Sequence, residues 1–259
     1  MWPFRRVGRS IALLLIILFG FGPSRAAAPV AVDLELVLAV DVSRSIDDDE
    51  FMLQKHGYAR AFTNPAVLSA IQASAHRQIA VTYVEWSGAD FQKVVVPWTL
   101  VSDAESGQLF SEALLRAPRS FAGWTSISGA IDFSVPLFGR GGFQGTRRVI
   151  DVSGDGVNNS GRPAASARDD AIAAGITING LVIMDNDPNP GMLGQSQPAL
   201  DEFYRDNVVG GPGAFVVAIK GFDTFAQAIM NKMVREIAAV PRPDTATTAE
   251  SQAARRRGG

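Results

Sequence analysis

Three short segments of the chain carry oxygen-bearing side chains beside apolar runs or glycines. Asp41, Ser43 and Ser45 form a D-x-S-x-S pattern directly after an apolar run. A hydroxyl-rich segment, GWTSISGAI, occupies residues 123–131, and Asp155 stands between two glycines in SGDG. The chain has no cysteine, and neither of its two histidines lies in these segments. The donors are therefore oxygens, which favour Mg²⁺, Mn²⁺ or Ca²⁺ over Zn²⁺ or Cu²⁺.

Six apolar runs rich in β-branched residues predict the strands that position these segments. They are residues 34–40, 79–84, 94–96 with their flanks, 149–152, 176–183 and 214–219. Because helical patterns lie between most of these runs, we predict an α/β fold with a doubly wound, mostly parallel six-stranded sheet and helices on both faces. A short turn near residues 87–89 predicts a hairpin and one antiparallel edge strand. The three oxygen-bearing segments then share the sheet edge at which such folds bind ligands.

Four helices have boundary or periodicity signals. The first is predicted at residues 48–62, and a capping-box spacing from Ser102 to Glu105 begins the second ahead of residues 109–115. Pro163 and Gly175 bracket the third, and apolar residues recur every fourth position between residues 225 and 237 in the last. With no repeat or linker in the sequence, one domain at residues 30–240 accounts for all of these elements.

The three segments resemble, in order and in context, the metal-ion-dependent adhesion site of von Willebrand factor type A (VWA) domains. That pattern is D-x-S-x-S, then a Thr in a later loop, then an Asp in a D-G turn. The resemblance covers residues 33–240 and is nearest to exported bacterial VWA-like proteins of unknown function, which DVSGDG, GGPGAF and the FAQAI helix also fit. It implies a divalent cation, Mg²⁺ first, held directly or through water by Asp41, Ser43, Ser45, Thr125 and Asp155. The chain departs from the family in having Trp124, where a glycine is common.

The resemblance implies a protein-binding module rather than an enzyme. Two carboxylates nearly neutralise the cation, which then takes an Asp or Glu carboxylate of a partner protein. The alternative is a metal-dependent hydrolase or phosphoryl-transfer enzyme. Its general base has little support, because His56 falls inside a predicted helix and His76 precedes a strand at the opposite edge. The chain also lacks a G-x-S-x-G elbow and a phosphate-binding G-x-x-x-x-G-K-[ST] loop.

Each motif also has a purely structural interpretation. Ser45 and Thr125 are suited to capping the helices that follow them, and Asp155 with Gly156 is suited to an ordinary turn. A VWA-like scaffold that binds no metal is therefore a third possibility. The ordered occurrence of all three motifs at strand ends favours the metal site over this interpretation.

Two other acidic stretches lie outside the three motifs. Asp151 is a carboxylate inside a predicted buried strand, and we expect it to pair with Arg147 or Arg148. The segment 185–194, DNDPNPGMLG, follows a strand and is expected to shape partner choice at the same edge. Its composition favours turns over a second cation site.

The two ends of the chain fall outside the predicted domain. Residues 1–26 have three arginines, Arg5, Arg6 and Arg9, ahead of an apolar run at residues 11–22, with small residues after it, which predicts a secretory signal peptide. That run is shorter than the roughly 20 residues that span a bilayer, so we expect an exported periplasmic or secreted protein without a stable membrane span. Residues 241–259 lack apolar periodicity and predict a disordered tail. A net charge of −2 gives no indication of nucleic-acid binding.

Overall fold

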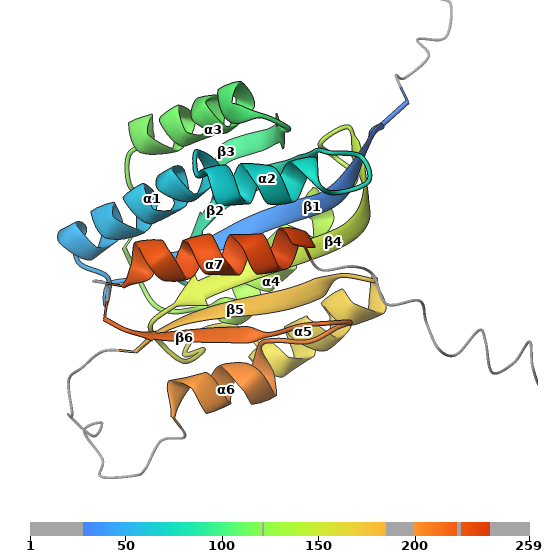
Figure 1. Ribbon diagram of the computed structural model, residues 1–259. Helices are drawn as coiled ribbons and strands as arrows, with labels where there is room; N and C mark the ends of the chain where they lie inside the picture. Colours follow the sequence, from blue (N-terminus) through green and yellow to red (C-terminus); the bar gives the residue numbers. More distant parts are fainter. Residues whose placement is uncertain (1–27, 121, 185–198, 222–223, 239–259) are drawn as a thin grey trace, which may run out of the picture.

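The computed structural model describes residues 28–120, 122–184, 199–221 and 224–238, and a six-stranded sheet forms its centre (Figure 1). The strands are β1 (Val30–Asp41), β2 (Ile79–Trp86), β3 (Gln92–Val101), β4 (Phe143–Gly154), β5 (Thr177–Met184) and β6 (Val216–Lys220), in the order β3-β2-β1-β4-β5-β6. Five strands are parallel, and β3 pairs antiparallel with β2 at one edge. The predicted sheet and its antiparallel edge strand are confirmed.

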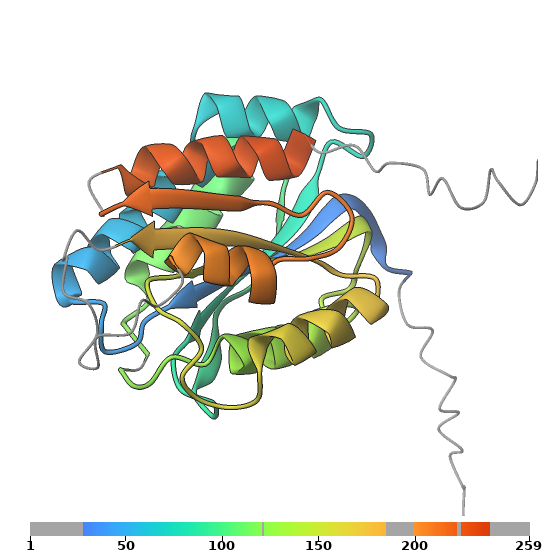
Figure 2. The same cartoon turned by 90° about the horizontal axis from the view of Figure 1, so that it is seen from below.

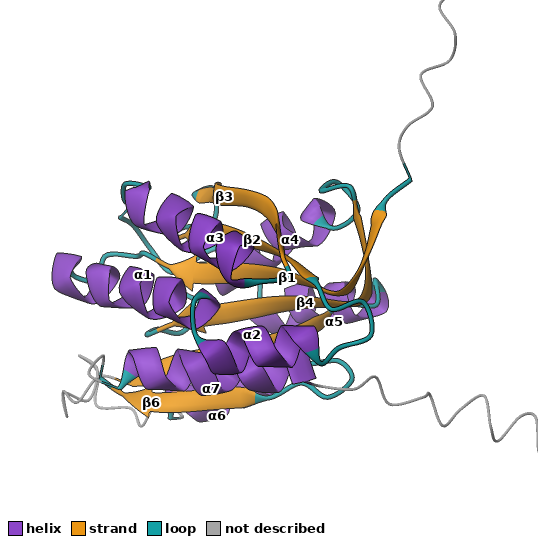
Figure 3. Ribbon diagram, turned by 45° about the horizontal axis from the view of Figure 1, so that its top comes forward, coloured by secondary structure: helices purple, strands orange, loops and turns teal. Residues whose placement is uncertain are grey.

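Helices cover both faces of the sheet, as predicted (Figures 2 and 3). One layer contains α1 (Asp48–Phe62), α2 (Pro65–Gln72), α3 (Ala104–Arg116) and α7 (Phe225–Ala238). The other contains α4 (Ile127–Ser134), α5 (Ala164–Ala173) and α6 (Leu200–Asn207), with a 3₁₀ turn at Val135–Leu137 after α4. Because side chains alternate along a strand, β1 sends Leu36 and Leu38 into the first layer and Val37 and Ala39 into the second. The central strand is therefore apolar on both faces.

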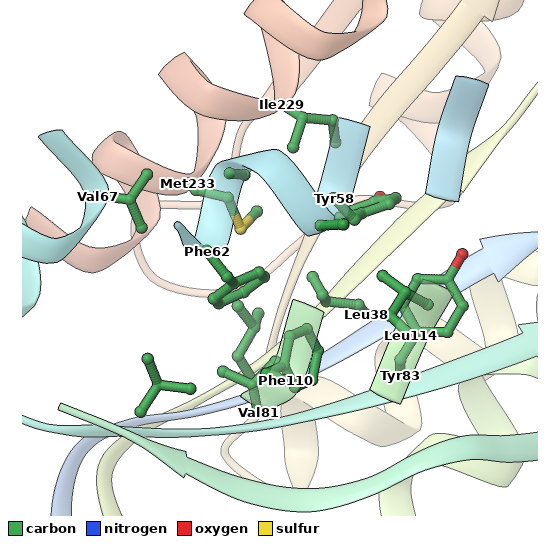
Figure 4. Packing of buried hydrophobic residues seen from close by; sticks show 14 of the residues in the cluster. Leu38, Tyr58, Phe62, Val67, Val81, Tyr83, Phe110, Leu114, Ile229 and Met233 are labelled. Carbon is green, nitrogen blue, oxygen red and sulfur yellow. The ribbon is translucent and has the colours of Figure 1, made fainter. Parts of the chain in front are cut away.

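Aromatic side chains fill the space between the sheet and the first helical layer (Figure 4). The ring centroids of Phe62 in α1 and Phe110 in α3 lie 4.6 Å apart, and Tyr58 meets Tyr83 of β2 edge to face at 5.6 Å. The predicted four-residue period of the last helix is confirmed, since its apolar residues are buried against the same cluster: Phe225, Ile229, Met233 and Ile237. These contacts fix α1 and α7 beside the sheet.

One predicted helix boundary is wrong by one residue. The α3 N-cap is Asp103, whose carboxylate accepts from Ser106 N at 2.9 Å, while Ser106 Oγ accepts from Asp103 N at 3.1 Å. The capping box therefore uses Asp103 and Ser106 rather than Ser102 and Glu105, and the helix begins one residue later than the spacing predicts. The helices α2 and α6 had no predicted counterpart, since eight residues hold only two helical turns.

The predicted partner of Asp151 is also wrong. Lys232 of α7 places its Nζ 2.5 Å from Asp151 Oδ1 and 2.5 Å from Glu236 Oε1, with all three side chains buried. Arg147 instead donates to the carbonyl of Glu236 at 2.8 Å, and Arg148 donates to that of Ala174 at 2.7 Å. Burial and the charge of Glu236 raise the pKa of Asp151 and Lys232 opposes them, with a net pKa of about 7.

Several predictions concern residues outside the described ranges: the signal peptide at 1–26, the tail at 241–259 and the loop at 185–194. Within the described part of the chain, no helix has the length and apolar character to cross a bilayer.

Candidate metal site

Four of the five predicted ligands form a chain of close oxygen contacts at the sheet edge where β1 and β4 end, on the left of Figure 1. Ser43 Oγ lies 3.1 Å from Ser45 Oγ, and Ser45 Oγ donates to Asp155 Oδ1 at 2.8 Å. Thr125 Oγ1 donates to Ser43 Oγ at 3.4 Å. Residues from three separate segments therefore present their oxygens to one another, although more than 80 residues separate Ser43 from Thr125 and 110 separate Ser45 from Asp155.

Asp41, the fifth predicted ligand, is fully buried behind these oxygens. Its Oδ1 accepts from Ser43 N at 2.7 Å, whereas its Oδ2 has no hydrogen-bond partner in the described structure. Burial, together with the charge of Asp155, raises the pKa of Asp41 to about 8. A buried carboxylate oxygen without a partner is costly, and a cation at this point would compensate it.

The donor set fits a hard divalent cation. The site offers two carboxylates and three hydroxyls, and the described residues gather no cluster of three or more His, Cys, Asp or Glu side chains. Oxygen donors of this kind suit Mg²⁺, Mn²⁺ and Ca²⁺. The site is therefore recognised by its contacting hydroxyls, since it holds only two carboxylates.

Arg119 positions the D-x-S-x-S loop from behind, a role that the sequence did not reveal. Its Nη2 donates to the carbonyls of Val42, Ser43 and Ile46 at 3.0, 3.1 and 2.7 Å. Its Nη1 also lies 3.0 Å from Asp48 Oδ1 in α1. A planar guanidinium can serve several acceptors at once, so one side chain fixes the curvature of the loop. No local pattern indicates this, because the contacts span more than 70 residues of sequence.

Two asparagines after the D-G turn position the threonine loop. Thr125 N donates to Asn159 Oδ1 at 2.9 Å, and Asn159 N donates back to the Thr125 carbonyl at 2.9 Å. Asn158 Oδ1 accepts from Ser128 N at 3.0 Å. The N-cap of α4 is Ser126, not Thr125, so the Thr125 hydroxyl is not used for capping. Ser45 is likewise not the cap of α1, since Asp47 has that role.

Gly154 is required by close packing behind Asp41. A Cβ at this position would lie 2.7 Å from the Tyr204 hydroxyl oxygen and 3.0 Å from Asp41 Oδ2. The Tyr204 hydroxyl, from α6, is also buried with no hydrogen-bond partner in the described part of the chain. Two unpartnered polar atoms therefore face the same side of Gly154. The first glycine of SGDG allows β4, β1 and α6 to meet at the site.

A pocket of about 450 Å³ opens beside the candidate ligands. It is lined by Arg44, Ser45, Gly123, Trp124, Thr125 and Asn159. Two of the predicted ligands thus form part of its wall, and Trp124 stands at its rim with 72% of its surface exposed. A group on another molecule can reach the oxygens through this opening.

Comparison with known proteins gives one match to a protein family. Residues 31–241 match the family described as "Protein of unknown function (DUF1194)". No curated protein matches the chain at a significant level.

Similar solved structures include several VWA domains. Proximal thread matrix protein 1 from the mussel byssus, "with zinc occupied MIDAS motif", is 14% identical, with a TM-score of 0.53 over 82% of this chain and 47% of that one. A von Willebrand factor type A protein from Catenulispora acidiphila is 16% identical, with a TM-score of 0.55 over 80% and 43%. The vWF domain of the type V pili tip protein Mfa5 from Porphyromonas gingivalis is 10% identical, with a TM-score of 0.53 over 85% and 99%. The chain spans about half the length of the first two, and the likeness shows a shared fold.

Proposed function

Because the chain belongs to the DUF1194 family of unknown function and has the VWA fold, we propose that it is a divalent-cation-dependent protein-binding module. The cation, Mg²⁺ in the first instance and Mn²⁺ or Ca²⁺ as substitutes, would be held by Asp41, Ser43, Ser45, Thr125 and Asp155. Its remaining coordination position would take an Asp or Glu carboxylate of the partner protein.

The observation that carries the proposal is the unpartnered Asp41 Oδ2 behind a connected set of hydroxyls. Asp41 and Asp155 together balance the two charges of the cation, and the hydroxyls add neutral donors. A cation so coordinated keeps affinity for one more anionic oxygen, and the adjoining pocket gives that oxygen access. The chain's own residues would thus bind the ion and leave its open coordination position facing the pocket.

Two of the structural relatives support this role. The mussel byssus protein has a structure with a zinc-occupied MIDAS motif, so a divalent cation suits this fold. The bacterial relative from P. gingivalis is a pilus tip protein, which suits surface attachment. Export through the signal peptide at residues 1–26 would place this chain where such attachment occurs.

An enzymatic role has less support from the geometry. His76 N donates to Asp33 at the amino end of β1, at the opposite edge of the sheet from Asp41. His56 lies on the exposed surface of α1. A general base needs to lie within hydrogen-bond reach of the reacting group, and neither imidazole contacts a predicted ligand in the described structure. Among the described residues, the candidate site offers no general base beyond its own carboxylates.

Calorimetric titration of the purified protein with Mg²⁺, Mn²⁺, Ca²⁺ and Zn²⁺ tests the proposal. We expect one ion per chain for at least Mg²⁺ or Mn²⁺, with a Kd of about 10⁻⁵ to 10⁻³ M, as for exposed oxygen-ligated sites. The control is the same titration of each ion into buffer without protein, which measures the heat of dilution. If none of the four ions binds, the metal-free scaffold is the correct interpretation.

Metal binding should also depend on pH, because the cation competes with a proton on Asp41. The pKa of this buried carboxyl is raised to about 8, so it is mostly protonated in the metal-free protein at neutral pH. Apparent metal affinity should therefore rise by about tenfold per pH unit up to pH 8 and become constant above it. Calorimetric titrations in buffers of different ionisation enthalpy measure the number of protons released per bound ion. We expect this number to be close to one at pH 6.5. Release that is unchanged at pH 9.5 would contradict this assignment.

A further inference from the structure

Two aromatic side chains lie exposed beside the candidate metal site. Trp124 is 72% exposed and Phe91 is 52% exposed. They come from different segments but approach the same point: a Cβ added at Gly88 would lie 3.2 Å from the Phe91 ring and 3.8 Å from Trp124 Cβ. Large apolar side chains that gather at the surface of a protein commonly mark a contact with another molecule.

The backbone around these two residues is fixed before any partner arrives. The hairpin turn closes through Ser87 N to the Phe91 carbonyl at 2.9 Å and Phe91 N to the Gly88 carbonyl at 3.1 Å. Ser126 N donates to the Ser87 carbonyl at 2.7 Å, which joins the hairpin to the threonine loop. The two aromatic residues are thus held at the end of β2 beside Thr125. A surface that is already ordered loses less entropy on binding.

Positive and negative side chains lie at different places around the site. Arg44 is exposed and lines the same pocket as Trp124, and its guanidinium makes no hydrogen bond or ion pair with the residues that the structure describes. On the other side of the D-x-S-x-S loop, the first turn of α1 carries exposed Asp48 and Asp49 next to Glu50. An acidic segment of a partner is repelled by the first turn of α1 and attracted toward Arg44.

We propose that the partner segment carries an aromatic or large apolar residue within two positions of its metal-binding Asp or Glu, and that Trp124 and Phe91 hold that residue. This inference rests on the proposed function and specifies the partner. Side chains two positions apart in an extended chain point to the same side, about 7 Å from each other, so one segment can present both groups to one surface. The carboxylate then faces the cation and Arg44, while the apolar side chain covers the exposed rings.

The probes are three capped synthetic peptides with the sequences GGDGFGG, GGDGAGG and GGNGFGG, titrated into the full protein with saturating Mg²⁺ or Mn²⁺ and followed by NMR. We expect GGDGFGG to bind about fivefold more tightly than GGDGAGG, which is the usual contribution of an aromatic contact. GGNGFGG should not bind, because it lacks the carboxylate. The indole N–H signal of Trp124 should shift with GGDGFGG and much less with GGDGAGG.

Trp124→Ala and Phe91→Ala should abolish the preference for GGDGFGG over GGDGAGG. The matched control is Leu109→Ala, which removes a 57% exposed side chain from α3 and should leave the preference intact. Metal binding of each variant is measured first by calorimetry. If the wild type binds the metal, and GGDGFGG and GGDGAGG bind with equal affinity, this inference is wrong and the proposed function stands. If no metal binds to the wild type, the proposed function fails and the inference fails with it.

Discussion

Asp41→Asn should remove cation binding and, at the same time, stabilise the metal-free protein. The substitution keeps an oxygen that can accept from Ser43 N, so the loop retains its local hydrogen bond. It removes one of the two negative charges of the site, and we expect metal affinity to fall by more than about 100-fold. The two effects have opposite signs, which a simple loss of folding would not produce.

The gain in stability follows from the raised pKa of Asp41. A buried acid with a pKa of about 8, against an ordinary value of 3.8, binds more protons in the folded state than in the unfolded state between these two values. Its contribution to stability is therefore lost progressively as the pH rises from about 4 to 8. Asn does not titrate, so the metal-free variant should exceed the wild type in stability by about 5 kcal/mol at pH 8 and by little at pH 4.

The measurements are calorimetric metal titration and urea unfolding with EDTA at pH 4 and pH 8. Asp49→Asn is the matched control, because it removes the same charge from an exposed position at the same sheet edge. It should change metal affinity by less than about threefold, as expected for a screened surface charge. If the Asp41→Asn variant binds the metal as tightly as the wild type, Asp41 is not a ligand of the metal.

The fold was predictable because strands and oxygen motifs are local patterns. The apolar run in β1, the hairpin of β2 and β3, and the ends of β1 and β4 all follow from short stretches of sequence. Parallel pairing then brings Asp41 and Asp155 to one edge without knowledge of any side-chain contact. What the sequence could not reveal is the set of residues that position the site. Arg119 acts across more than 70 residues, and Asn159 looks like ordinary turn chemistry.

The wrong partner for Asp151 shows why nearness in sequence is a poor guide within a strand. Arg148 is separated from Asp151 by an odd number of positions and so points to the opposite face of β4. Arg147 shares the face of Asp151 but lies four residues away, about 13 Å along the strand. The positive charge next to Asp151 is instead the ammonium of Lys232 in α7, a helix that packs across that face of the sheet.

Lys232→Met should strongly destabilise the folded protein. It leaves the carboxyls of Asp151 and Glu236 buried together without the ammonium that lies 2.5 Å from each. Removing one member of a buried ionic cluster costs about 3–5 kcal/mol. Equilibrium urea unfolding at pH 8 measures the loss, and Lys93→Met, at an exposed position on β3, is the control with an expected change below about 0.5 kcal/mol.

The pH dependence of the Lys232→Met variant separates this charge effect from lost packing. Burial and Glu236 already raise the pKa of Asp151, and without Lys232 nothing opposes them. The folded variant should therefore bind extra protons from about pH 4 upward through neutrality, so its stability should fall as the pH rises. A packing defect would cost the same at pH 5 and pH 8, whereas the lost ammonium should cost less at pH 5. Adding Asp151→Asn to the variant should restore part of the stability at pH 8, because one of the two uncompensated carboxylates is then gone.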